Sequence, residues 1–333
     1  MQLARRGASA LAATAAGLLA ALAAWAAEPG LELEGKIALG NVSGRIDHLA
    51  VDLDHQRLFV AELGNDSVGV VDLTTMTTLR TLTGFREPQG VGYVRATGEI
   101  YVANAGDGLV HILRGGDFAP NGRIDLGDDA DNVRVEASGN RVFIGYGKGA
   151  LALIDANSHA RVANLALKAH PESFQLETST SRAFVNVPDA GHVAVMDIGS
   201  GRQVATWQVP GQHANFAMAV DTQGGEVFVA FRRPARLAVF ASRDGAVVGN
   251  LDLCDDSDDV FFDSRRHRLY VSCGAGMVDV FQRSVQGWAR ASRVQTASGA
   301  RTSLFVPELD RLFVAVRGGW RESAALWVFR ATP

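Results

Sequence analysis

The sequence predicts an all-β fold, a seven-bladed β-propeller whose blades are four-stranded antiparallel sheets. A short strand with a central aromatic residue recurs through the chain, with separations of 41 to 44 residues between successive copies. Period-2 alternation of apolar residues, bounded by turn residues, surrounds each copy, and no segment has a sustained helical period. A repeat of this length made of strands is typical of a propeller blade. The aromatic residues are Phe59, Tyr101, Phe143, Phe184, Phe228, Tyr270 and Phe313.

The first 27 residues resemble a secretory signal peptide. Arg5 and Arg6 precede an uncharged stretch rich in Ala and Leu, and residues 24–26 have the small-x-small pattern that signal peptidase recognises. We expect residues 1–27 to be cleaved and the mature protein to be periplasmic or secreted. An uncleaved membrane anchor is the alternative, because about 20 apolar residues can span a bilayer. No later stretch predicts a transmembrane span.

The composition excludes several classes of protein. Of 333 residues, 47% are hydrophobic and 20% are charged, which is ample for a packed core and excludes a disordered chain. The formal net charge is −4, so the chain lacks the broad positive field that gathers nucleic acid or an anionic membrane. We therefore expect particular residues, not total charge, to select the partners.

Each repeat predicts the same four strands in order. The first strand ends at an acidic residue, as in 48–52 and 259–263, and a polar turn leads to the aromatic strand. A loop rich in Gly, Asn and Asp precedes an alternating third strand, as in 67–72, and a fourth strand such as 122–126 completes the unit. Four strands in this order form one antiparallel blade.

The two ends of the domain are predicted to share one blade. The seventh repeat ends after its third strand at 325–329, and residues 35–40 resemble the fourth strand at 122–127. An N-terminal strand that completes the last blade closes the ring and leaves no open sheet edge. Residues 31–330 are thus expected to form a single domain.

The repeats resemble those of the YVTN-repeat β-propeller family, which includes YncE-like periplasmic proteins. The motif is carried by residues 58–72, 100–104 and 183–187, and the resemblance extends over roughly residues 31–330. The third motif residue is usually Ala, Gly or Ser here, in place of the Thr of the family name. The resemblance implies an extracytoplasmic binding or surface protein, and related seven-bladed rings include lactonases and a lyase.

Polar residues in the loops from fourth to first strands predict a ring of side chains around one mouth of the central tunnel. That face is the usual ligand site of a propeller. The predicted ring consists of Asp47, His48, Gln89, Asp131, Asn132, Glu172, His213, Asn215, Asp258, Asp259 and Arg301. A plainer alternative is that these residues bind water and neighbouring backbone groups, because Asp and Asn also build turns.

Oxygen-bearing side chains in this ring are candidate metal ligands. Asn132, Glu172 and Asp259 have the ligand types that a divalent cation of the Ca or Mg type prefers. A metal-activated water held there would suit lactone opening, with His48 or His213 as acid or base. No cofactor is assigned, and the sequence contains no Gly-x-Ser-x-Gly nucleophile elbow.

Loops between second and third strands place charged residues on the same rim. Acidic residues at 255–259 lie between basic loops in the sequence, which predicts ion pairs across the rim. The alternative is a groove in which arginines bind an anion and Trp320 stacks on a ring or sugar. The candidate rim residues are Arg232, Arg233, Arg317, Trp320 and Arg321.

The chain has exactly two cysteines, Cys254 and Cys273. Cys254 ends a fourth strand and Cys273 ends the next aromatic strand, so both are expected toward the same face. An exported chain favours a disulfide between them, which would hold the acidic loop 255–259 in place. Two buried free thiols are the alternative, because a Cα separation beyond about 7 Å forbids the bond.

The remaining histidines are interpreted as structural, because none has a second ligand at fixed spacing. They are His55, His111, His159, His170, His192 and His267.

These observations favour a monomeric, exported binding protein that holds a small molecule, peptide or protein at the tunnel mouth, with no catalysis assigned. A metal-dependent lactonase-like or lyase-like enzyme that uses the same ring is the alternative. Nucleic acid is not an expected partner, because the chain is acidic overall and offers a single candidate stacking residue on the rim, Trp320.

Overall fold

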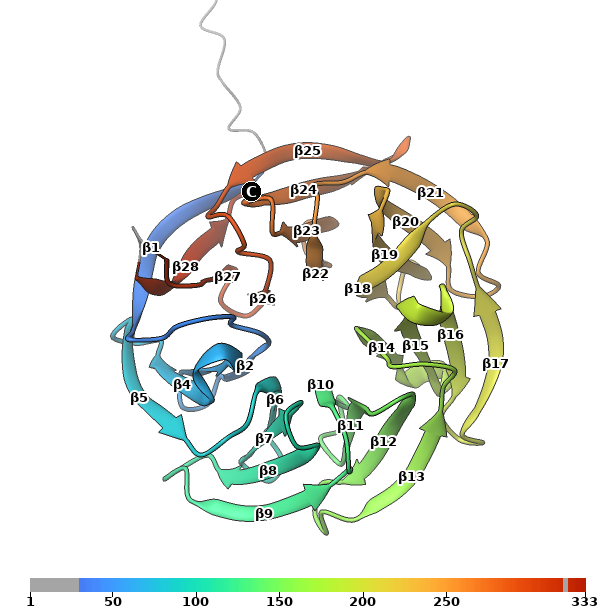
Figure 1. Cartoon of the computed structure of the whole chain (residues 1–333). Coiled ribbons are helices and arrows are strands. Elements are labelled where there is room, and N and C mark those ends of the chain that lie inside the picture. Colours follow the sequence, from blue (N-terminus) through green and yellow to red (C-terminus); the bar gives the residue numbers. More distant parts are fainter. Residues whose placement is uncertain (1–29, 320–322) are drawn as a thin grey trace, which may run out of the picture.

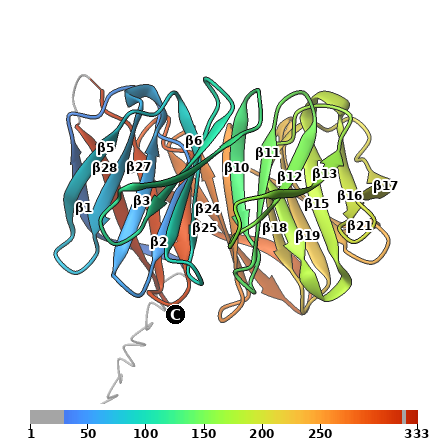
Figure 2. The same cartoon turned by 90° about the horizontal axis from the view of Figure 1, so that it is seen from below.

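A computed structural model describes residues 30–319 and 323–333, and in them seven four-stranded antiparallel sheets form a ring (Figure 1). Inner strands of these sheets line a central tunnel. The innermost strand of each sheet lies next to the tunnel and the fourth strand forms the outer wall. Figure 2 shows the sheets standing side by side, with their loops on two opposite faces. The predicted fold class is confirmed. The predicted signal peptide lies outside the described residues.

Six blades are built from consecutive strands. Blade 1 has β2 (Leu49–Asp52), β3 (Arg57–Glu62), β4 (Ser67–Asp72) and β5 (Thr77–Thr83), and blade 2 has β6 (Pro88–Val94), β7 (Glu99–Asn104), β8 (Leu109–Arg114) and β9 (Pro120–Asp125). Blade 3 has β10 (Ala130–Val135), β11 (Arg141–Tyr146), β12 (Ala150–Asp155) and β13 (Arg161–Ala166), and blade 4 has β14 (Phe174–Glu177), β15 (Arg182–Val187), β16 (His192–Asp197) and β17 (Arg202–Trp207). Blade 5 has β18 (His213–Asp221), β19 (Glu226–Arg233), β20 (Ala235–Ala241) and β21 (Val247–Asp252), and blade 6 has β22 (Ser257–Asp263), β23 (Arg268–Cys273), β24 (Met277–Ser284) and β25 (Gly287–Gln295). Three short 3-10 turns lie between strands at Leu63–Asn65, Thr178–Thr180 and Pro188–Ala190.

Blade 7 closes the ring as predicted. It joins β26 (Ser303–Val306), β27 (Arg311–Val316) and β28 (Ala324–Ala331) to the N-terminal strand β1 (Leu31–Gly40). β1 pairs with β28 from Leu31 opposite Ala331 to Gly40 opposite Ala324. The ammonium of Lys36 lies 3.6 Å from the centre of the Trp327 ring, a cation–π contact across this pair.

The recurring aromatic residues form the centre of the blades. All seven are 0% exposed, because the second strand of each sheet is covered on both faces by neighbouring blades. The outer strands are largely exposed on one side, which explains their weaker apolar pattern in the sequence.

Acidic residues at the ends of first strands have a local role on the face opposite the tunnel mouth. Asp52 Oδ1 accepts hydrogen bonds from the backbone N–H groups of Asp54 and His55, which closes the turn to the next strand. In blade 4, Glu177 instead pairs with Arg182, the first residue of the aromatic strand. These contacts account for the acidic residue that ends the first strand of blades 1 and 4.

Blades 2 and 3 approach each other unusually closely at Gly90. A Cβ atom at Gly90 would lie 2.0 Å from the carbonyl oxygen of Asp131, well inside any allowed contact. Only the absence of a side chain lets β6 lie this close to β10, and this packing fixes the position of Asp131 beside the tunnel.

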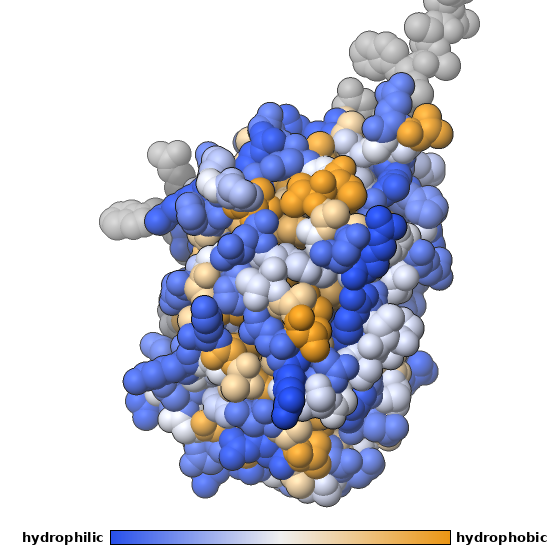
Figure 3. Space-filling model, turned by 90° about the vertical axis from the view of Figure 1, so that its right-hand side faces the viewer, coloured by the Kyte–Doolittle hydropathy of each residue, from blue (hydrophilic) through white to orange (hydrophobic). Residues whose placement is uncertain are grey.

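On the side shown in Figure 3, apolar patches are separated by polar surface. The exposed valines Val204, Val247 and Val248 belong to the outer strands β17 and β21. Within the part of the chain that the structure describes, no helix is long and apolar enough to cross a membrane.

Candidate functional site

One end of the tunnel contains a polar cavity of about 200 Å³, here called the tunnel mouth. Its lining residues come from the loops before the inner strands and from the rim. They are Arg45, Asp47, His48, Gln89, Asp131, Asn132, Glu172, Ser173, Phe216, Arg232, Asp258 and Arg301. Most of the predicted ring is therefore brought together in one cavity.

Blades 1 and 4 enter their sheets through a β-bulge. The N–H of Asp47 donates to the carbonyl of Ala61, and the N–H of Ala61 donates to the carbonyl of His48, so two residues lie opposite one. Glu172 and Ser173 lie opposite Asn186 in the same way. A bulge turns a side chain away from its regular direction, and here it turns polar groups toward the mouth.

Blades 2, 3, 5 and 6 have a register shift at the same point of the inner strand. The shifts fall between Pro88 and Gly90, Ala130 and Val133, Asn215 and Ala217, and Ser257 and Asp259. The residues inside these shifts all line the mouth: Gln89, Asp131, Asn132, Phe216 and Asp258. The backbone geometry of the inner strand thus decides which side chains line the cavity.

Two carboxyl groups of the mouth have raised pKa values. Burial, with repulsion from Asp131 and Asp258, raises the pKa of Asp47 to about 8 against the opposing effect of Arg45 and Arg301. The pKa of Glu172 is raised to about 8, first by burial and then by the same two carboxylates. No ion pair to Glu172 is formed within the described part of the chain.

Arginines from blades 5 and 7 hold the acidic loop of blade 6 between them. Arg232 forms an ion pair with Asp258 and donates from Nε to the carbonyl of Ser257 at 2.8 Å. Arg301 Nε lies 2.9 Å from Asp258 Oδ2, and its Nη1 lies 2.9 Å from Asp256 Oδ1. The guanidinium of Arg232 also lies 3.7 Å from the centre of the Phe216 ring.

His170 lies beside the mouth, a position that the predicted ring does not include. Its Nδ1 lies 2.6 Å from the carbonyl oxygen of Gly147, and its Nε2 lies 3.7 Å from Asp131 Oδ2. Burial lowers the pKa of His170, but the interactions with Asp131 and Gly147 outweigh burial and raise it to about 9. The sequence did offer a sign of this position. His170 lies in the loop before Glu172, and the loops of this type converge on the mouth.

Three predicted ring residues lie away from the cavity. His213 is exposed at the start of β18, where it pairs in register with Arg233, which is also exposed. Asn215 is fully buried and donates from Nδ2 to Asn186 Oδ1 at 2.9 Å, which ties blade 5 to blade 4. Asp259 lies deeper in the tunnel and accepts a 2.8 Å hydrogen bond from the N–H of Ser303.

The rim candidates are only partly gathered at the mouth. Arg317 lines a smaller neighbouring cavity of about 80 Å³ together with Arg45 and Arg301. Trp320 and Arg321 lie outside the described residues.

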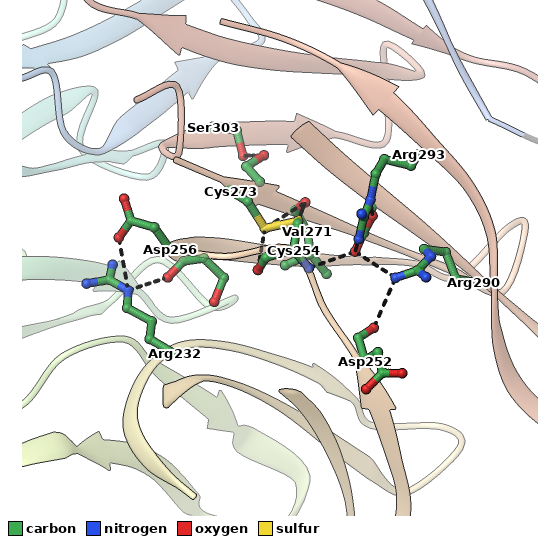
Figure 4. Close-up of a disulfide and its surroundings, with 12 residues drawn as sticks. Arg232, Asp252, Cys254, Asp256, Val271, Cys273, Arg290, Arg293 and Ser303 are labelled. Carbon is green, nitrogen blue, oxygen red and sulfur yellow. Dashed lines mark hydrogen bonds and ion pairs between the residues drawn. A yellow bond between two sulfur atoms is a disulfide. The ribbon is translucent and has the colours of Figure 1, made fainter. Parts of the chain in front are cut away.

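The predicted disulfide between Cys254 and Cys273 is present (Figure 4). Its Cα atoms are 5.9 Å apart, which is within the range that allows the bond. The N–H of Cys254 donates to Asp279 Oδ2 at 2.9 Å, and the fully buried Asp279 also accepts from Arg293. The loop that carries Asp256 and Asp258 is therefore anchored directly beside its first residue.

The predicted metal ligands do not share one cavity. Asn132 and Glu172 line the mouth, whereas Asp259 lines the deeper part of the tunnel. Among residues 30–319 and 323–333, no group of three or more His, Cys, Asp or Glu side chains is placed to hold a metal ion.

The comparisons with known proteins are informative about the fold alone. No family model matches the chain. No curated protein matches it either. Among solved structures, a chain of hydrazine synthase from Kuenenia stuttgartiensis is similar, with a TM-score of 0.71 and 17% sequence identity over 83% of this chain and 94% of that chain. Because 1782 solved chains match, this similarity shows that the chain has a widely used β-propeller fold.

Proposed function

We propose that this chain is an exported binding protein that holds a small organic cation, such as a primary amine, in the tunnel mouth. We assign it no catalytic step. The observation that carries the proposal is the carboxyl group of Glu172, which lines the cavity and makes no ion pair to any described residue. Asp47 faces the same cavity, and the pKa of each carboxyl is raised to about 8.

A raised pKa of this origin favours a cationic ligand. Burial and neighbouring carboxylates, Asp131 and Asp258, keep the protons of Asp47 and Glu172 in place. A cation that enters the cavity supplies the missing positive charge, so the carboxyl can ionise and pair with it. The proton then acts as a competitor of the ligand.

Unpaired acceptors support the same ligand chemistry. Asp131 Oδ1 and Asn132 Oδ1 are buried without a hydrogen-bond partner in the described structure. An unpaired buried acceptor costs about 1–3 kcal/mol, and an ammonium group offers three donors and no acceptor. An amine in the mouth would therefore donate to oxygen atoms that accept no hydrogen bond within the described residues.

The cavity suits an organic cation better than a bare metal ion. Its volume of about 200 Å³ leaves room for a carbon skeleton beside the charged group. Calcium needs several oxygen ligands at about 2.3–2.6 Å, whereas an ammonium group needs only hydrogen-bond distances of about 2.7–3.2 Å. The arginines of the mouth already have partners: Arg45 donates a hydrogen bond to Asp47, and Arg232 and Arg301 form ion pairs with Asp258.

Titration calorimetry with butane-1,4-diamine tests the proposal. We expect binding to strengthen by about 20-fold between about pH 6.5 and about pH 8.5, because the proton of Glu172, whose pKa is about 8, must leave first. Glu172→Gln should weaken binding by about tenfold or more and reduce its pH dependence. His213→Ala is the matched control, because His213 does not line the mouth.

Two outcomes would overturn the proposal. The first is diamine binding that is absent in the native protein or equal in the native protein and Glu172→Gln. The second is stoichiometric calcium binding accompanied by lactone hydrolysis, which would establish the metal-dependent enzyme instead.

A further inference from the structure

Below the tunnel mouth, the tunnel forms a second cavity of about 430 Å³ with a different lining. The inner strands of blades 1, 2, 3, 4, 6 and 7 contribute to it, and His48 is the one residue that also lines the mouth. Its volume is in the range of about 300–1,000 Å³ that is typical of small-molecule sites. The tunnel interior is therefore large enough to hold a ligand of its own.

Arg134 on β10 is a cation without a carboxylate partner in this cavity. Its Nη1 donates to the carbonyl of Val133 at 3.1 Å, and its guanidinium lies 5.8 Å from the centre of the Phe174 ring. Within the described part of the chain, no carboxylate lies within ion-pair distance of Arg134. A guanidinium has five N–H donors, so most of its hydrogen-bonding capacity is unused by the protein.

The surroundings of Arg134 make its unpaired positive charge unfavourable. Burial lowers the pKa of Arg134, while the more distant Asp259 and Asp131 act in the opposite direction. Arginine nevertheless remains charged in proteins, so a partly desolvated positive charge is retained. Asp259 lines the same cavity and accepts a hydrogen bond from the N–H of Ser303, but it forms no ion pair with Arg134 within the described residues.

The rest of the wall combines apolar residues with the polar side chains of His48, Gln175 and Ser303. Leu49, Val91, Val133, Phe261 and Leu304 line the cavity around Arg134. A bare inorganic anion would pair with the guanidinium but would leave this wall in contact with water. An anion with a hydrocarbon body would cover the wall and also pair with the arginine.

We propose that the tunnel interior is a binding site, separate from the mouth, for a small organic carboxylate with an apolar body whose carboxylate pairs with Arg134. The site does not depend on the proposed amine site. Its ligand differs in charge and its lining shares a single residue with the mouth.

Octanoate is the probe that tests this site, and 1-octanol is its uncharged counterpart. Octanoate should bind the native protein. Arg134→Met should weaken that binding by about tenfold or more, because this substitution removes the charge and keeps an unbranched, apolar side chain in its place. The affinity of Arg134→Lys for octanoate should lie between those of the native protein and Arg134→Met. Binding of 1-octanol should change by less than about twofold in Arg134→Met.

Two further measurements separate a binding role of Arg134 from a structural one. Glu172→Gln should leave octanoate binding unchanged, so failure of the amine site would not imply failure of this one. Without ligand, the Tm of Arg134→Met should equal or exceed that of the native protein, because an unpaired charge is removed. Absent octanoate binding, equal octanoate binding in Arg134→Met, or a marked fall in the ligand-free Tm of that variant would overturn the proposal.

Discussion

Arg301 Nε lies 2.9 Å from Asp258 Oδ2, so the guanidinium of blade 7 is paired with the acidic loop of blade 6 at the tunnel mouth. Arg232 of blade 5 forms an ion pair with the same carboxylate from the other side. Three neighbouring blades are thus joined through one side chain. The positive charge of Arg301 also acts on Asp47, whose pKa it lowers.

Replacing Arg301 should therefore change the titration of Asp47. In Arg301→Met the pKa of Asp47 should rise further above about 8, because one of the two arginines that stabilise its ionised form is removed. Carboxyl ¹³C chemical shifts followed against pH give this pKa. Arg243→Met is the control, since Arg243 is 84% exposed and pairs with Asp244. An unchanged or lowered pKa of Asp47 would contradict the electrostatic coupling across the mouth.

Stability should decrease as the pH rises from about 6 to about 8.5. Over this range the folded protein holds protons on Asp47 and Glu172, each with a pKa of about 8, that the unfolded chain has already released. His170, with a pKa raised to about 9, acts in the same direction, because its stabilising interactions are lost as the pH passes through that value. Urea unfolding at several pH values measures how steeply the free energy of unfolding falls with pH.

The double variant Asp47→Asn, Glu172→Gln should flatten that slope. Neither amide titrates, so the folded and unfolded states then differ in bound protons mainly at His170. If the free energy of unfolding of the double variant depends on pH as steeply as that of the native protein, groups other than Asp47 and Glu172 hold these protons.

Removing the disulfide should lower the free energy of unfolding by about 3 kcal/mol. The two cysteines are 19 residues apart, and closing a loop of this size restricts the unfolded chain by about that amount. Denaturant unfolding of Cys254→Ser, Cys273→Ser gives the value, with the reduced native protein as the comparison. Two reactive thiols in the denatured, non-reduced native protein would contradict the bond itself.

Gly90→Ala should destabilise the protein by about 1–3 kcal/mol, because the new methyl group forces β6 away from the carbonyl of Asp131. The same shift displaces Asp131 and should weaken binding at the mouth. Gly116→Ala is the matched control, since a Cβ atom at Gly116 meets nothing within 4 Å. Equal stability of the two variants would show that blades 2 and 3 can separate without cost.

The fold was predictable because each blade repeats the same local pattern. Phe59 and its six counterparts mark the second strands, and these strands are buried on both faces, so their apolar character is strong. The predicted N-terminal strand starts at residue 35, whereas β1 starts at Leu31. The first residues of β1, which include Glu32 and Glu34, are partly or fully exposed and pair with Arg330 and Arg311, so they show no apolar alternation.

The position of the cavity at the tunnel mouth was predictable from the sequence, but not every side chain that lines it. The loops before the inner strands were identified correctly, and Asp47, Asp131 and Glu172 lie where those loops meet. His213 and Asn215 do not line the mouth, because β18 begins at His213 and Phe216 occupies the bulge of that blade. Which residue falls in a bulge depends on pairing with the next strand, and a single-strand pattern does not reveal it.

The bulges at the tunnel mouth are held by backbone atoms, whereas the cavity is lined by the side chains at the same positions. Their hydrogen bonds, as between Asp47, His48 and Ala61, are made by backbone atoms. The side chains at these positions can therefore be exchanged while the ladders that hold each blade remain intact. A library randomised at Gln89, Asn132 and Phe216, with Asp258 kept for its ion pairs to Arg232 and Arg301, should yield folded rings with different cavity linings, which makes this chain a practical starting framework for designed receptors.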